Sequence, residues 1–296
     1  MSKAVGVIGL GLMGLAMSKK LIEAKFNIQG YDIDQNRVDE LVSEGGKSVS
    51  SPKEAATGAD FVITSLLYSE VVREVCLGKD GICESNNKGL IVIDTSTSRP
   101  EDSIETGSDM QKNGFQFLDA SLSGGSPDVL KRNMVAMVGG DKDAFSKAKE
   151  VLEVFSRSIY HLGSNGAGAR TKLIVNQVLG LNRLVLAEGL VMGMKAEMDT
   201  ETLLKVLKDS AAYSKAMDTR GEIMINAAYD PPISRIKQHH KDVRLILEQG
   251  QKLASPTLLS QIHLQVLQAA EQSGLGESDT GSIIEIFRRL AGIPSK

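Results

Sequence analysis

At 296 residues the chain exceeds the ~100–200 residues of a typical domain, so we expect two domains. Hydrophobic residues make up 42% of the chain and charged residues 24%, as in globular proteins with a substantial core. The formal net charge of -3 gives no electrostatic reason to expect a nucleic-acid partner.

Several further classes of protein are disfavoured by the sequence. Cys76 and Cys83 are too few for a disulfide framework, and nothing near them has a metal-ligand spacing, so we expect no metal site. The first residues lack the features of a signal peptide. No stretch approaches the ~20 apolar residues of a membrane span. We therefore expect a cytoplasmic protein without a membrane partner.

Short apolar runs alternate with longer amphipathic segments in the first half of the chain. The runs lie at residues 5–9, 28–31, 61–64, 90–93, 115–118, 134–138 and 158–162. Apolar runs without strict alternation, separated by helices, are typical of a parallel sheet covered on both faces. We expect an α/β domain over residues 1–163, with a doubly wound, mostly parallel sheet of the Rossmann type.

A glycine-rich junction at residues 163–168 ends this pattern. From about residue 169 to 195 the chain has no proline and is apolar nearly all round, which predicts a buried helix. We expect a long interdomain helix over residues 164–195 and an all-helical domain over residues 196–296. The breaks in the helical pattern fall at residues 230–232, 255–256 and 273–274.

A glycine motif follows the first apolar run and opens the first helical segment. It consists of Gly9, Leu10, Gly11, Leu12, Met13 and Gly14, and matches G-x-G-x-x-G. In this context the first glycine permits a tight turn, the second lets the backbone approach a pyrophosphate, and the third allows close helix–strand packing. Free amides at the helix N-terminus attract the phosphates. The alternatives are a simple turn, a methyltransferase or a flavin protein.

The second apolar run ends at Asp32, 18 residues beyond Gly14. An acidic residue there accepts hydrogen bonds from the adenosine ribose and repels a 2′-phosphate. The sequence therefore predicts NAD as the cofactor. Arg37 keeps NADP as the alternative, because its side chain could reach such a phosphate.

Two polar segments follow later strands of the predicted sheet. Residues 94–98 carry hydroxyl groups where a parallel strand ends, so they either face the ligand crevice or cap the next helix. Residues 119–125 include Ser123, Gly124 and Gly125, whose hydroxyl and amides could hold a substrate carboxylate. The alternative for this second segment is an ordinary loop.

Lys172 stands near the start of the long predicted helix, and Asn176 follows one helical turn later. Their spacing places both on one helix face, within reach of the same substrate oxygen. On a helix otherwise apolar nearly all round, we expect the amine to be sheltered from solvent. Desolvation and the helix dipole disfavour its charged form, which suits the group to proton transfer.

These segments together resemble the β-hydroxyacid dehydrogenase family, which includes 3-hydroxyisobutyrate dehydrogenases and semialdehyde reductases. The resemblance covers essentially the whole chain, and its motifs fall in the family's order. It implies an oxidoreductase that transfers a hydride between NAD(P) and a small hydroxy acid or semialdehyde. It also implies a homodimer or homotetramer.

The resemblance assigns roles to individual residues. Lys172 is the implied general acid/base, and the implied substrate-binding residues are Ser96, Ser123, Gly124, Gly125 and Asn176. Beyond the glycine motif and Asp32, the implied cofactor-binding residues are Leu66, Leu67, Thr97 and Lys241. The chain departs from the family pattern at Tyr68, at residues 121–122 and at residues 132–133. These departures do not touch the implied acid/base, but they leave the named substrate open.

Two rival functions remain on the same fold: an imine reductase-like enzyme and a non-catalytic dinucleotide-binding scaffold. Lys172 argues against both, because we expect its loss in either. Residues 281–290 offer an apolar face that could pack on its own domain or on a neighbouring subunit. His239 and His240 stand beside Lys241 and could enter the ligand pocket, but we expect them on a solvated helix surface.

Overall fold

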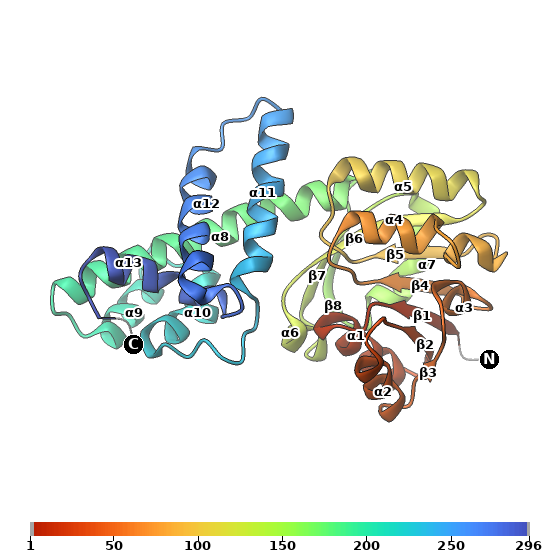
Figure 1. Ribbon diagram of the computed structural model, residues 1–296, viewed down its shortest axis with the longest axis horizontal. Coiled ribbons are helices and arrows are strands. Elements are labelled where there is room, and N and C mark those ends of the chain that lie inside the picture. The colour runs from red at the N-terminus through yellow and green to blue at the C-terminus, as the bar shows by residue number, and fades with distance from the viewer. Residues whose placement is uncertain (1–2, 295–296) are drawn as a thin grey trace. The chain divides into compact units, whose positions relative to one another are not determined.

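The computed structural model describes residues 3–294, and the chain divides into two compact units, residues 1–172 and residues 173–296 (Figure 1). Unit 1 contains the sheet that the apolar runs predict. Unit 2 is helical.

Within the described residues, unit 1 is built on one eight-stranded sheet of order β3-β2-β1-β4-β5-β6-β7-β8. Its strands are β1 (Ala4–Ile8), β2 (Asn27–Tyr31), β3 (Lys47–Ser48), β4 (Phe61–Thr64), β5 (Ile91–Asp94), β6 (Gln116–Ser123), β7 (Met134–Gly139) and β8 (Ser156–His161). Only β6 and β7 pair antiparallel among these neighbours. The predicted mostly parallel Rossmann-type sheet is confirmed.

Helices cover both faces of this sheet. They are α1 (Leu12–Glu23), α2 (Gln35–Ser43), α3 (Pro52–Ala56), α4 (Ser69–Leu77), the short turn η1 (Ile82–Ser85), α5 (Pro100–Lys112), α6 (Ser126–Leu130) and α7 (Lys142–Leu152). Two successive residues of β4 pack in different hydrophobic clusters. Ile63 lies in the cluster that includes residues of α1, and Val62 lies in the cluster that includes residues of α4. Burial on both faces explains why the central strands are continuously apolar.

Strand β6 is longer than the expected run at residues 115–118. It continues to Ser123, so the predicted hydroxyl and glycine segment begins inside the sheet, paired with β7. Apolar Leu118, Ala120 and Leu122 alternate with polar residues here, and all three apolar side chains are buried. This period of two is the signal for a strand that the shorter prediction missed.

Unit 2 is formed by helices that pack around one apolar core. They are α8 (Ala167–Lys195), which begins in unit 1, α9 (Thr200–Asp209), α10 (Lys215–Asn226), α11 (Ile236–Lys252), α12 (Leu258–Ala270), the turns η2 (Glu271–Leu275) and η3 (Thr280–Ile283), and α13 (Ile284–Leu290). The predicted helical C-terminal region is confirmed. Ile283, Ile284 and Ile286 are buried in this core, so most of the apolar face at residues 281–290 packs on its own unit.

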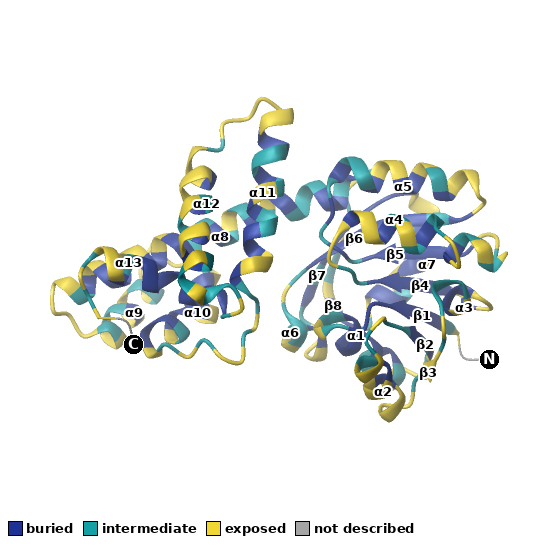
Figure 2. Cartoon of the chain, viewed as in Figure 1, coloured by how far each residue is buried: buried dark blue, intermediate teal, exposed yellow. Residues whose placement is uncertain are grey.

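Helix α8 is not buried on every side, contrary to expectation (Figure 2). Ile174, Val178, Val185 and Met192 are between 56% and 76% exposed. By length and composition α8 also meets the requirement for a membrane-spanning helix, contrary to the expectation for the whole chain. Core helices of soluble proteins meet the same requirement, so the absence of a membrane partner stays a prediction.

The prediction that His239 and His240 lie on a solvated surface is wrong. Both are buried, because α11 presents this face to α8 and to the segment after α12. The Nδ1 atom of His240 lies 2.6 Å from a carboxylate oxygen of Glu271. His239 packs against the ring of His263, and Gly180 of α8 makes room for it: a Cβ there would lie 2.3 Å from the Nε2 atom of His239.

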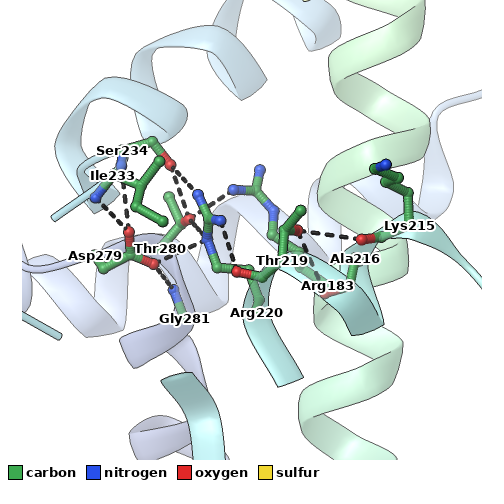
Figure 3. A network of polar contacts seen from close by, with 10 residues as sticks. All are labelled: Arg183, Lys215, Ala216, Thr219, Arg220, Ile233, Ser234, Asp279, Thr280 and Gly281. Carbon is green, nitrogen blue, oxygen red and sulfur yellow. Dashed lines mark hydrogen bonds and ion pairs between the residues drawn. The ribbon is translucent and has the colours of Figure 1, made fainter. Parts of the chain in front are cut away.

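A buried polar network crosses the core of unit 2 (Figure 3). Arg220 forms an ion pair with Asp279 at 2.9 Å, and both arginines of the network, Arg183 and Arg220, donate to the hydroxyl of Thr280. Burial and the nearby Arg220 lower the pKa of Arg183 to about 10. Nothing in the sequence pattern predicts this network, since its members lie far apart along the chain.

Candidate active site

The glycine motif forms the turn between β1 and α1. Gly9 has φ of 90°, and a Cβ at this position would lie 2.3 Å from the carbonyl oxygen of Ser65. A Cβ at Gly14 would lie 1.9 Å from the carbonyl oxygen of Gly9. The protein's own packing therefore requires the first and third glycines.

Gly11 differs from the other two glycines. A Cβ here would meet nothing closer than the Nη1 atom of Arg37, at 3.7 Å. Gly11 is also the N-cap of α1, with no side-chain capping bond and no acidic residue in the first turn. The first amides of α1 thus remain available to an anion, and the lack of a side chain at Gly11 lets it approach. This cradle fits a cofactor pyrophosphate.

Asp32 braces the glycine turn. One carboxylate oxygen accepts a hydrogen bond from the backbone amide of Leu10 at 2.6 Å, and the other accepts one from the amide of Asp34 at 2.9 Å. The Nε atom of Arg37 lies 3.3 Å from a carboxylate oxygen of Asp34. The Nη1 atom of Arg37 also lies 3.5 Å from the carbonyl oxygen of Leu10. Asp32, which favours NAD, and Arg37, which keeps NADP as the alternative, therefore lie beside the same turn.

The ends of β4 and β5 bring the next predicted residues together. The backbone amide of Leu66 donates to the hydroxyl of Ser96 at 3.0 Å, and Ser96 is buried. Leu67 is exposed, and Thr97 is half-buried. None of residues 94–98 is the N-cap of α5, which is Arg99, and the Arg99 side chain makes no capping hydrogen bond.

Asp94, at the end of β5, holds this arrangement. Its carboxylate accepts hydrogen bonds from the hydroxyl of Thr64 at 2.8 Å and from the amide of Ser96 at 3.1 Å. Burial raises the pKa of Asp94, although these hydrogen bonds act in the opposite direction. The buried carboxylate thereby positions Ser96 through its backbone.

The predicted carboxylate-binding group lies at the end of β6. Ser123 is the last residue of the strand, and Gly124 has φ of 132°. The amide of Gly125 donates to the side chain of Asp128 at 2.9 Å. Since that amide already has an acceptor, the hydroxyl of Ser123 and the amide of Gly124 are the better candidates for a ligand.

Lys172 lies in the first part of α8, and its side chain extends to β6. Its Nζ atom donates to the carbonyl oxygen of Leu122 at 2.5 Å, and the side chain is half-buried. Leu122 immediately precedes Ser123. The structure therefore places the predicted acid/base next to the predicted carboxylate-binding residue, although they are far apart in sequence.

The remaining predicted residues lie in unit 2. Asn176 is buried, and its side-chain amide donates to the carboxylate of Asp242 at 2.9 Å. The Nζ atom of Lys241 lies 3.6 Å from the same carboxylate. The sequence reasoning missed Asp242, although its place directly after Lys241 was a signal. Among residues 3–294, no group of three or more His, Cys, Asp or Glu side chains could hold a metal ion.

Comparison with known proteins identifies the family. The NAD-binding domain of 6-phosphogluconate dehydrogenase matches residues 4–163, and the NAD-binding domain of NADP-dependent 3-hydroxyisobutyrate dehydrogenase matches residues 166–287. The chain belongs to the β-hydroxyacid dehydrogenase family. As a β-hydroxyacid dehydrogenase it is an NAD(P)-dependent oxidoreductase.

Individual members of this β-hydroxyacid dehydrogenase family match nearly the full chain. Glyoxylate/succinic semialdehyde reductase 1 of Arabidopsis thaliana is 30% identical, over 96% of this chain and 98% of that protein. The crystal structure of 3-hydroxyisobutyrate dehydrogenase from Salmonella typhimurium is 25% identical, with a TM-score of 0.88 over 97% of this chain and 100% of that one.

Imine reductases share the fold alone. The enzyme from Pseudomonas sp. is 19% identical, with a TM-score of 0.65 over 97% of this chain and 100% of that one. The relatives therefore favour the dehydrogenase over the imine reductase-like alternative.

Proposed function

We propose that this enzyme interconverts a small, carboxylate-bearing hydroxy acid and the corresponding aldehyde or ketone, with Lys172 as general acid/base. Bound NAD(P) supplies the hydride acceptor in oxidation and the hydride donor in reduction. In oxidation, neutral Lys172 takes the hydroxyl proton while the carbinol C–H bond breaks and the C=O bond forms. In reduction, the ammonium returns this proton to the carbonyl oxygen.

The observation that carries the proposal is the position of the Lys172 amine. Its acceptor, the carbonyl of Leu122, belongs to the residue before Ser123. An amine held there can reach the reacting oxygen of a substrate whose carboxylate is bound by Ser123 and Gly124. Asn176 lies one turn along α8 from Lys172, and we propose that it binds the same oxygen.

We propose NAD as the preferred cofactor, because the carboxylate of Asp32 at the end of β2 would repel a 2′-phosphate. Leu66, Leu67, Thr97 and Lys241 are proposed to contact the cofactor on the strength of the family resemblance. Short hydroxy acids and semialdehydes assayed with NAD and NADP separately test this choice. A clear NADP preference would mean that Arg37, rather than Asp32, determines the selection.

Three further features belong to the proposal. We propose that residues 1–163 bind the dinucleotide, residues 164–195 link the domains, and residues 196–296 form the helical domain. We propose a cytoplasmic homodimer or homotetramer. The exposed apolar side chains of α8 support self-association, since Val178, Val185 and Met192 recur at intervals of seven residues.

Replacement of Lys172 tests the mechanism. We expect Lys172→Ala to lower kcat by at least ~100-fold, the range of one general acid/base. The Kd for NAD, measured by fluorescence, should stay within about twofold, since the described hydrogen bond of the lysine amine goes to Leu122 of β6. Lys195→Ala is the matched control, because it removes an exposed lysine from the end of the same helix. Near-normal turnover by Lys172→Ala would refute the assignment.

A further inference from the structure

Helix α8 begins against the side chain of a distant residue. Asp119 of β6 is 1% exposed, and one of its carboxylate oxygens accepts a hydrogen bond from the amide of Gly166 at 2.8 Å. The other oxygen accepts one from the amide of Ala169 at 2.9 Å. The first amides of a helix have no partner within the helix, and a carboxylate satisfies them well. Asp119 therefore closes the N-terminus of α8 from outside the helix.

The backbone of α8 rests directly on the sheet at this point. A Cβ at Gly168 would lie 2.3 Å from the carbonyl oxygen of Asp119 and 2.4 Å from that of Met137. A Cβ at Gly139 would lie 2.7 Å from a carboxylate oxygen of Asp119. The first turn of α8 thus packs directly on β6 and β7, with no room for a side chain between them.

Lys172 makes the third connection between the same helix and strand. Ala169 and Lys172 are three residues apart on α8, and their acceptors, Asp119 and Leu122, are three residues apart on β6. Three residues advance ~10 Å along a strand but only ~4.5 Å along a helix. The long lysine side chain spans the remaining distance to Leu122. The position of its amine therefore depends on where the first turn of α8 is held.

We infer that Asp119 is a positioning residue for the reaction: by fixing the first turn of α8 on β6, it sets the place of the Lys172 amine beside Ser123. The inference rests on the proposed role of Lys172. Asp119 itself touches neither the glycine turn nor the lysine among the contacts described for it; it acts through the helix.

Asp94 offers a matched control within the same sheet. It pairs with Asp119 in the register of β5 and β6, is equally buried, and likewise has a pKa raised by burial. Its hydrogen bonds come from Thr64 and from Ser96, not from α8. A substitution at Asp94 therefore reports the cost of altering a buried carboxylate that holds the Ser96 segment instead of α8.

The test combines Asp119→Asn with Lys172→Ala. Asn keeps the size of the side chain but turns one acceptor into a donor that faces an amide. We expect kcat to fall by ~10–100-fold, as for a displaced catalytic group, with the Kd for NAD unchanged. In the Lys172→Ala background the same substitution should lower the residual rate less than about twofold, because the group it positions is gone. Asp94→Asn should lower the rate by the same factor in both backgrounds.

Each result decides the question. Normal kcat in Asp119→Asn, or an equal loss in both backgrounds, would overturn the inference while leaving Lys172 as the acid/base. Near-normal turnover in Lys172→Ala would instead reject the proposed function. If Asp119→Asn does not fold, Asp119→Ser takes its place, since it is smaller and keeps one acceptor. Loss of NAD binding in both variants would assign Asp119 to the stability of unit 1 and also overturn the inference.

Discussion

Two helices of this enzyme, α1 and α8, begin at glycine-rich turns, and they differ in whether the protein itself supplies an acceptor for their first amides. At α1 the N-cap is Gly11, which makes no side-chain capping bond, and a Cβ would meet nothing closer than the Nη1 atom of Arg37, at 3.7 Å. At α8 the carboxylate of Asp119 accepts two of the first amides, and Gly168 touches the sheet. The turn before α1 is therefore open to an external anion, and the turn before α8 is closed by the protein's own carboxylate, Asp119. We call them the open turn and the closed turn.

This difference shows what a glycine pattern alone conveys. Glycine permits close approach at both turns, but the approaching group is a ligand at one and the protein's own backbone at the other. A carboxylate supplied from elsewhere in the fold makes the distinction. The open turn should therefore govern cofactor affinity, and the closed turn should govern stability and the position of Lys172.

A negative charge placed at the open turn should produce the largest effect, on the affinity for NAD. Gly11→Asp places a carboxylate at the N-terminus of α1, and we expect the Kd for NAD to rise ~100-fold, equivalent to ~2.7 kcal/mol. The Tm should change little, because Gly11 has φ of -64° and ψ of -171°, which any residue adopts. Calorimetric titration with NAD and thermal unfolding measure the two quantities.

Gly11→Ala separates charge from bulk in that experiment. It adds the same Cβ without a carboxylate and should weaken NAD binding less than Gly11→Asp does. If both variants bind NAD as tightly as the wild type, the first amides of α1 do not hold the pyrophosphate, and the contrast between the turns is lost.

A methyl group added at the closed turn should lower the stability of the protein and not its affinity for NAD. Gly168→Ala forces the new methyl group against the carbonyl oxygens of Asp119 and Met137. We expect a loss of ~1–3 kcal/mol in the free energy of unfolding, typical of overpacking, measured by urea denaturation. Gly189→Ala is the matched control on the same helix, where a Cβ would meet nothing within 4 Å. It should be neutral or stabilising, and an equal loss in both variants would contradict the close contact.

The closed turn should also respond to pH, with the smallest effect. Burial raises the pKa of Asp119 above its ordinary value of 3.8, although the amides of Ala169 and Gly166 act in the opposite direction. For an acid whose folded pKa is raised, the stabilising contribution is complete below the unfolded pKa and is lost as the pH rises through the folded one. The stability advantage of the wild type over Asp119→Asn should therefore decline as the pH rises from 3.8 through this raised pKa. The decline should be ~1.4 kcal/mol for each pH unit that separates the folded pKa from the unfolded one. An advantage that grows over this range in urea denaturation would contradict the direction.

The features that the sequence could predict are local ones. Apolar runs revealed the sheet, and the glycine motif of α1 could be recognised because strand, turn and helix are contiguous. The contacts that position the site are not local: Asp119 reaches Gly166 across 47 residues, and Asn176 reaches Asp242 across 66. Single polar side chains carry no periodic signal, so these partners become visible only in the folded chain.

Errors at the level of elements had a different origin. The burial of His239 arises because Gly180 lets α11 approach α8 closely, and a polar ring on a charged segment does not reveal such an approach. The longer β6, by contrast, was readable from its alternation at residues 118–123. In the first case the burial depends on a partner helix; in the second the pattern lies along one strand.

The bond from the amide of Leu10 to Asp32 bears on any effort to redesign coenzyme choice in this enzyme. The same carboxylate that would discriminate between the two dinucleotides also supports the peptide that precedes Gly11. Replacing Asp32 with an apolar residue would remove the charge, but it would also leave that amide without its acceptor and loosen the loop for both coenzymes. A successful exchange must therefore supply a neutral acceptor at residue 32, such as the oxygen of serine or asparagine, together with the new phosphate contact.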